Sequence, residues 1–165
     1  IIKTMYKTDI IDSKIIDLLM EDGRMPASVI ARKLGHGLTE RIVRYRIGKM
    51  VRKGIIQIRP IVNPSAFGLT TRADVFLEVD SDAIKSVAQH VSRFEYVTYV
   101  ACSIGETDIS LQLVGRDSNE IYHLVTDVIG KIPGVRKTTT SIVPLVLKDV
   151  YQWNFPQNET KPGSS

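Results

Sequence analysis

The first third of the chain has apolar side chains at helical spacing. Between residues 12 and 20 the apolar positions are 15, 16, 18, 19 and 20, which predicts a helix with a wide buried face. Gly23 is expected to end this helix in the left-handed conformation, and Pro26 suits the start of a second helix over 27–34. Thr39 suits the N-cap of a third helix, which carries an apolar stripe at positions 43, 47, 50 and 51 and ends at Gly54. The pattern therefore predicts three short helices.

A different pattern follows Pro64. Alternating or β-branched runs predict strands over 72–79, 96–104, 109–114 and 135–147. Helical spacing predicts helices over 81–92 and 118–132, the second with Val128 among its buried residues. The order βαββαβ is that of a ferredoxin-like domain, an antiparallel sheet with helices on one face. The other face is left bare, so we expect the chain to form a homodimer.

These elements define an α+β protein with two domains. A helix-turn-helix, winged-helix-like domain is predicted over residues 1–54, and the ferredoxin-like domain over 69–150. Residues 55–68 are interpreted as a hinge: Ile55–Val62 alternates like a strand, which Pro60 and Pro64 restrict to an edge. Residues 151–165 form a polar tail that contains Tyr151, Trp153 and Phe155.

The net charge of +4 is unevenly divided along the chain. Residues 1–63 contain 13 Lys and Arg against 6 Asp and Glu, whereas residues 64–165 contain 9 against 12. The basic first part is therefore expected to meet a polyanion. A polybasic membrane patch is the weaker alternative, because the basic residues alternate with apolar residues of core type and form no single block.

Many of these basic residues lie on the predicted third helix. After Glu40 that helix contains no acid, whereas an ordinary solvated helix mixes both signs at i,i+4. Three short helices with a basic third one are typical of a helix-turn-helix, whose recognition helix enters the DNA major groove. A merely solvated basic helix is the alternative.

The candidate DNA contacts differ in what they can bind. An Arg can bind guanine through two hydrogen bonds, so base or groove contacts are expected from Arg41, Arg44 and Tyr45, the last suiting a sugar or phosphate equally well. Phosphate contacts, which add affinity but no sequence information, are expected from Arg32, Lys33, Lys49 and Arg52. Arg46 lies beside the apolar stripe, so an ion pair with Asp12 or Asp22 explains it as well as a DNA contact does.

Several short motifs follow one another along the chain. They are Asp9-Ile-Ile-Asp12, Asp22-Gly23-Arg24, Gly37-Leu38-Thr39, Gly54-Ile55-Ile56, and Val62-Asn63-Pro64 followed by Gly68. In this order they resemble the Lrp/AsnC family of leucine-responsive, or feast/famine, regulatory proteins. The resemblance implies a transcription regulator that binds double-stranded DNA at a pseudo-palindromic operator. It also implies a homodimer, which can assemble into tetramers or octamers, and an amino acid effector.

The chain departs from the family pattern in two respects. Gly35-His36-Gly37 makes the turn before the third helix two residues longer, and Thr39-Glu40 stands where the family commonly has Ser-Pro. These departures bear on the angle between the second and third helices and leave the expected fold unchanged.

A candidate effector site follows the Gly-x-x-Asp sequence at Gly105–Asp108, which matches the effector loop of the family. Gly105 lets a ligand approach the backbone, and Asp108 can pair with an α-ammonium group. Hydroxyls of Thr138, Thr140 or Ser141 can hold an α-carboxylate. The resemblance places the site between subunits and implies Cys102, Gly105, Asp108, Ser141 and Ile142. An ordinary hairpin turn beside strand-forming threonines is the alternative.

The sequence favours no enzyme class. It contains no P-loop, dinucleotide fingerprint or nucleophile–base arrangement, and no cofactor is expected. The single cysteine, Cys102, fits a cytoplasmic protein, and the three histidines have no metal-ligand spacing. Two alternatives stay open. One is a sirohaem decarboxylase, which resembles this family in fold and has His90 and His123 as its candidates. The other is a sensing or assembly module without DNA binding.

Overall fold

The computed structural model describes residues 8–35 and 37–149. The chain forms two compact units, one built on the residues up to Ile61 and the other spanning Val62–Leu147. Each is described by itself. Within the described residues, no helix is long and apolar enough to cross a membrane.

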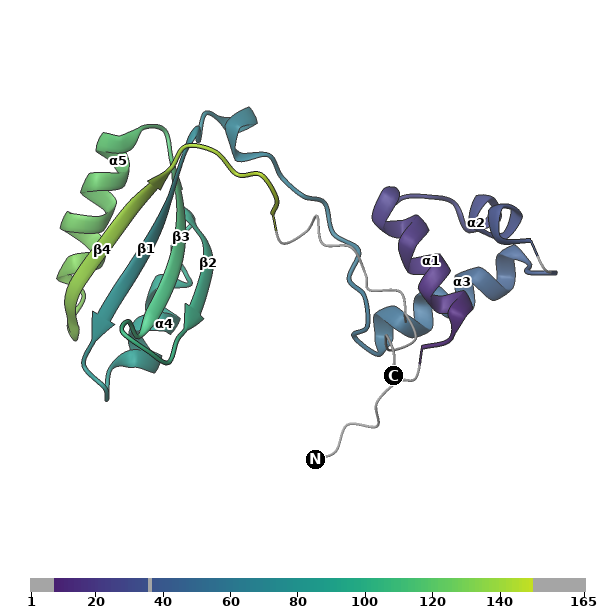
Figure 1. Ribbon diagram of the computed structural model, residues 1–165, viewed down its shortest axis with the longest axis horizontal. Helices are drawn as coiled ribbons and strands as arrows, with labels where there is room; N and C mark the ends of the chain where they lie inside the picture. The colour runs from purple at the N-terminus through teal and green to yellow at the C-terminus, as the bar shows by residue number, and fades with distance from the viewer. Residues whose placement is uncertain (1–7, 36, 150–165) are drawn as a thin grey trace, which may run out of the picture. The chain divides into compact units, whose positions relative to one another are not determined.

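The N-terminal unit is a bundle of three helices, as predicted. They are α1 (Ile10–Glu21), α2 (Ala27–Leu34) and α3 (Glu40–Arg52) (Figure 1). Each helix contributes apolar side chains to one core, where Ile15, Ile30, Val43 and Met50 are fully buried. Val51, which the sequence placed in the apolar stripe, is instead 44% exposed. The buried stripe of α3 is therefore narrower than its pattern suggested.

Side chains cap the starts of α1 and α3 and the end of α1. Asp9 caps α1 by accepting a hydrogen bond from the Asp12 amide at 2.8 Å, and Thr39 caps α3 by accepting one from the Ile42 amide. The prediction for Gly23 is wrong. The α1 cap is Asp22, in extended conformation at φ −145°, and its carboxylate accepts a hydrogen bond from the Arg24 amide at 2.9 Å. That side-chain turn ends the helix without a left-handed residue.

Residues 53–70, which connect α3 to the first strand, contain no strand, so the strand predicted over Ile55–Val62 is wrong. The described part of the chain has no strand before residue 71, and the helix-turn-helix accordingly shows no wing hairpin. A strand exists only where its amides pair, and Pro60 has no amide hydrogen to offer. The segment ends in a 3₁₀ turn, η1 (Pro64–Phe67), where the Asn63 side chain accepts a hydrogen bond from the Ser65 amide at 3.1 Å.

The C-terminal unit has the predicted βαββαβ order. Its helices are α4 (Ile84–Val91) and α5 (Ser118–His123), and its strands are β1 (Thr71–Val79), β2 (Val97–Cys102), β3 (Ile109–Gly115) and β4 (Val135–Val143). The sheet is antiparallel in the order β2-β3-β1-β4, with both helices packed on one face (Figure 1). Alternate residues of β1, from Ala73 to Val79, are buried beneath them, as predicted.

Several elements of this unit are shorter than predicted: β2 ends at Cys102 and not at residue 104, and α4 begins at Ile84 and not at residue 81. Strand β4 stops at Val143 and does not reach residue 147, because Pro144 cannot donate a ladder hydrogen bond. The helix predicted over 118–132 is regular only to His123. A π-helical turn, η2 (Leu124–Val128), and a 3₁₀ turn, η3 (Ile129–Lys131), follow it. This break turns Val128 outward, so that it is 40% exposed and not buried as predicted.

Substitution of Gly134 tests how closely the turn between η3 and β4 packs against the residues before α4. The φ of Gly134 is +92°, and a Cβ there would lie 2.6 Å from the Cβ of Ala83. We expect Gly134→Ala to destabilise the C-terminal unit by about 2–4 kcal/mol, from backbone strain and overpacking together. Gly68→Ala is the control, because Gly68 has φ +78° but nothing within 4 Å of an added Cβ. Hydrogen exchange of sheet amides measures both, and equal losses would contradict the steric contact.

Candidate DNA interface and effector site

The exposed face of α3 carries the residues predicted to contact bases. Arg41, Arg44 and Tyr45 are all exposed, with Tyr45 at 62% and the Arg44 side chain at 73%. They line one open concavity together with Glu40. Glu40 also forms an i,i+4 ion pair with Arg44. The helix buries Val43 and Met50 on its other side, so core packing itself directs these three side chains outward.

The residues predicted to contact phosphate differ in how freely they are presented. Arg32, in the last turn of α2, and Arg52, in the last turn of α3, are exposed. Lys33 lies 4.0 Å from the Glu21 carboxylate, a distance at which the pair is weak. Lys49 is only partly exposed.

Arg46 is bound within the protein. Its Nη1 lies 2.8 Å from a carboxylate oxygen of Asp9 and 2.8 Å from one of Asp12, which is 1% exposed. The ion pair with Asp12 proposed from the sequence is therefore present. The alternative partner Asp22 instead takes part in the turn after α1. We consequently remove Arg46 from the expected DNA contacts.

The ionisation of Asp9 reflects this cluster. Partial burial alone would raise the pKa of Asp9, but hydrogen bonds from the Asp12 amide and the Arg46 guanidinium outweigh burial and lower it below its ordinary value. The same two carboxylates raise the pKa of Arg46. The cluster joins the start of α1 to the middle of α3.

The longer turn before α3 is closed by its own backbone. The Gly35 amide donates to the Ala31 carbonyl at 3.0 Å, and the Leu38 amide donates to the Gly35 carbonyl at 3.0 Å. Gly35 and Gly37 both have positive φ, which glycine adopts without strain. His36 lies outside the described residues.

The candidate effector residues are divided between two edges of the sheet. Cys102 ends β2, and Gly105 lies in the hairpin that follows, whereas Thr138, Thr140, Ser141 and Ile142 belong to β4. The register aligns Cys102 with Ile109, Ile109 with Leu77, and Leu77 with Thr138. Three strand spacings, about 14 Å, therefore separate Cys102 from Thr138. One protomer does not bring the two groups together.

The β4 candidates also face different ways. Thr138 pairs with Leu77 and Thr140 with Val75, which places both on the helix-covered face. Ser141 pairs with Asp74 and points to the open face. The hydroxyls proposed for an α-carboxylate thus do not form one cluster within the unit.

Asp108 already has partners within the protein. Its Oδ2 accepts a hydrogen bond from the Val79 amide at 2.7 Å and lies 3.9 Å from a guanidinium nitrogen of Arg136. Arg136 also donates to the Val79 carbonyl at 3.2 Å and lies 3.6 Å from Asp80. Arg136 could not be predicted from the sequence, because its partners lie near it only in the folded sheet. The β2–β3 loop is consequently tied to the end of β1.

Taken together, these features define a class. One unit is a helix-turn-helix with a basic, exposed third helix, and the other is a ferredoxin-like domain with no group of three His, Cys, Asp or Glu placed to hold a metal among the described residues. This is the architecture of a DNA-binding transcription regulator.

Comparison with known proteins identifies the family. Residues 9–51 match the AsnC-type helix-turn-helix domain, and residues 72–152 match the Lrp/AsnC ligand binding domain. An HTH-type transcriptional regulator of Pyrococcus furiosus is 33% identical over 148 residues, covering 89% of this chain and 96% of the relative. The chain belongs to the Lrp/AsnC family.

Two further relatives agree. The HTH-type transcriptional regulator LrpA of Pyrococcus horikoshii is 31% identical over 83% of this chain and 96% of its own length. The crystal structure of a transcriptional regulator of Neisseria meningitidis in complex with L-Met has a TM-score of 0.82 at 25% identity, over 92% of this chain and 98% of that one.

Replacing Arg46 tests the charged cluster. Arg46→Met leaves the buried Asp12 without this cation, and we expect it to destabilise the N-terminal unit by about 2–3 kcal/mol. Arg44→Met, which removes an exposed i,i+4 pair on the same helix, is expected to cost no more than about 0.5 kcal/mol. Hydrogen exchange of α1 and α3 amides in the full chain measures both.

The stability lost in Arg46→Met is expected to depend on pH. The folded-state pKa of Asp9 is lowered, so its contribution to stability is complete above its unfolded pKa of about 3.9 and is lost as the pH falls further. Arg46→Met should therefore flatten the loss of stability below about pH 4. An unchanged acid profile would show that Arg46 does not hold Asp9 ionised.

Proposed function

We propose that the chain is a sequence-specific transcription regulator whose DNA binding or assembly responds to a small molecule, an amino acid. The observation that carries the DNA-binding part is the exposed Arg41, Arg44 and Tyr45 on α3, directed away from the buried face of that helix. Side chains in this position on a third helix reach base edges in the major groove. A protein that acts on DNA in this way is expected in the cytoplasm.

A homodimer is the proposed DNA-binding unit. The open face of the sheet carries Phe76 at 37% and Tyr99 at 52% exposure, beside Gln112, which donates to Asp74 at 3.0 Å. Large aromatic side chains exposed on a sheet favour a partner surface. A two-fold dimer presents two α3 helices to a pseudo-palindromic operator. Further assembly to tetramers or octamers belongs to the same proposal.

The effector site is proposed at an interface between protomers. Arg136 at the start of β4 already lies near Asp108 within one protomer, but Cys102 and Thr138 are three strand spacings apart. In this proposal a second copy therefore supplies the β4 residues that complete the site beside the β2–β3 loop of the first. The likeness to a regulator solved with L-Met supports an amino acid as the effector. In this proposal Asp108 takes the α-ammonium group with the carboxylate oxygen that does not accept from Val79.

The relatives reported above are named as transcriptional regulators, which supports this function over the tetrapyrrole decarboxylase. A Soret absorption band in the purified protein would favour the enzyme instead.

Removing the exposed arginines tests DNA binding. We expect Arg41→Ala and Arg44→Ala each to weaken binding to DNA from upstream of the protein's own gene by about 10- to 100-fold and to reduce preference over scrambled DNA. Arg52→Ala should weaken both DNAs alike and lower the salt dependence by about one counterion. Fluorescence anisotropy at several salt concentrations measures these effects, with Lys85→Ala, a charge removed from the other unit, as control.

If the wild-type chain shows no preference for upstream over scrambled DNA at any salt concentration, the regulator proposal fails. The sensing or assembly module without DNA binding would then be the better interpretation.

A charge-neutral change at Asp108 tests the effector site. Asp108→Asn keeps an oxygen to accept from the Val79 amide but loses the negative charge, so we expect a response to the effective amino acid at least about tenfold weaker, with the fold retained. Asp80→Asn removes the neighbouring acid beside Arg136 and serves as the matched control. The readout is the shift of DNA affinity with each of the twenty amino acids. If DNA affinity in Asp108→Asn still shifts fully with the amino acid, the Asp108 carboxylate has only a structural role.

A further inference from the structure

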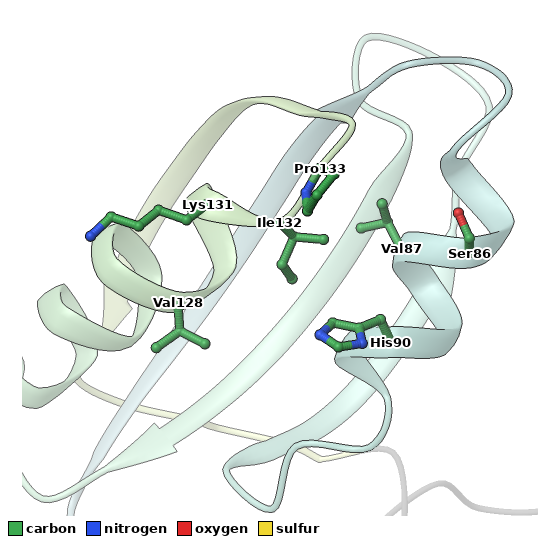
Figure 2. Close-up of a pocket in the computed structure, with 7 residues that line it drawn as sticks. All are labelled: Ser86, Val87, His90, Val128, Lys131, Ile132 and Pro133. Carbon is green, nitrogen blue, oxygen red and sulfur yellow. The ribbon is translucent and has the colours of Figure 1, made fainter.

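A groove lies on the helix-covered side of the C-terminal unit, between α4 and the turns that follow α5 (Figure 2). Its volume is about 460 Å³, within the range of about 300–1,000 Å³ that small-molecule sites occupy. Helix α4 contributes Ser86, Val87 and His90, and the other wall consists of Val128 and Lys131–Pro133. All of these residues belong to one unit, so the groove is complete in a single protomer.

The Val128 wall exists because the helix is broken. After His123 the backbone widens into the π turn η2 and then tightens into the 3₁₀ turn η3. Val128, which a continuous helix would bury, is 40% exposed and lines the groove. π turns are rare and occur frequently at functional sites. The distortion is therefore an observation, independent of the cavity itself, that points to a ligand.

The interior of the groove is largely apolar. Figure 2 shows Val87, Ile132 and the His90 ring directed into the space between the two walls, whereas the Lys131 side chain extends away from it. Val87 is 2% exposed and Ile132 is partly buried, so they form an apolar floor. The His90 ring makes an edge-to-face contact with Phe94, with centroids 5.2 Å apart. An imidazole in an apolar groove suits a ligand that has one polar group at the end of an apolar body.

The residues that line the groove do not repel an anion. None of the lining residues, all within the described chain, is acidic. The neighbouring Asp127 is bound by His123 Nδ1 at 2.9 Å and by Lys131 Nζ at 3.0 Å. These hydrogen bonds, that of His123 first, lower the pKa of Asp127. Its charge is compensated by its own partners, so the groove offers a donor for a carboxylate but no lining acid for an ammonium group.

We propose that this groove binds a small monocarboxylate with a branched aliphatic or aromatic chain and no α-ammonium group. The apolar chain packs on Val87, Val128 and Ile132, and the carboxylate accepts a hydrogen bond from His90. The groove shares no residue with the proposed amino acid site at Gly105–Asp108 and does not depend on it.

Ligand-observed NMR on the full-length chain tests the site. The probes are ketoleucine and phenylpyruvate, and the matched ligands are leucine and phenylalanine, in which an ammonium group replaces the keto oxygen. Val128→Trp fills the groove from an already exposed position, so it removes no buried side chain and should abolish binding. His90→Ala should weaken binding about tenfold. Gln89→Ala, an exposed neighbour on α4 that does not line the groove, is the matched control and should leave binding unchanged.

Loss in Val128→Trp, weakening in His90→Ala and no change in Gln89→Ala would support the proposal. Absence of binding by both keto acids at millimolar concentration, or equal binding by wild type and Val128→Trp, would overturn the site. Binding of leucine or phenylalanine in the groove as tight as that of their keto acids would overturn the ligand class.

Discussion

The bridge from Arg46 to Asp9 and Asp12 is the interaction on which the DNA-binding unit depends. Asp12 is buried at the start of α1, and a buried carboxylate needs a paired cation. Arg46 supplies it from the middle of α3, while Asp12 and Asp9 cap each other across the first turn of α1. One guanidinium therefore fixes the orientation of the recognition helix against α1. The basic residues of α3 consequently divide into one that holds the helix and others that remain available to DNA.

The order of strands imposes the corresponding constraint on the C-terminal unit. With β2 and β4 at opposite edges, no motion within one sheet can bring Cys102 and Ile142 to a common ligand. Any site that uses both must be assembled from two copies, which links ligand binding to oligomeric state. Asp108 joins the β2–β3 loop to the end of β1, because its carboxylate accepts a hydrogen bond from the Val79 amide. A ligand that engages Asp108 thus acts on a loop already joined to the sheet.

The spacing of apolar residues along the chain predicted the features of the fold that depend on nearby residues. Periodicity located α1–α3, β1 and β3, because each of these elements buries one face, and runs of β-forming residues located β2 and β4. It failed where a distant partner decides the outcome. Ile55–Val62 alternates like a strand but has none assigned, and the alternation of a chain cannot reveal whether a partner strand exists. Arg46 matched two interpretations until folding placed it 2.8 Å from Asp12. The candidate effector residues lie at two edges of the sheet because of the order of strands in space. The order of elements along the chain does not determine that spatial order.

Val128 shows how a local break in a helix changes which side chains are exposed. Its sequence context is that of a buried helical position, because the spacing of the apolar residues predicts an unbroken helix over 118–132. The π turn instead adds one residue to a single helical turn, which rotates the side chains that follow and moves Val128 out of the core. Val125 and Ile129, on either side, stay buried, so most of the apolar face of this segment still packs in the core. The Val128 side chain becomes a wall of the groove, and the helix thereby provides core packing and a cavity from one short segment.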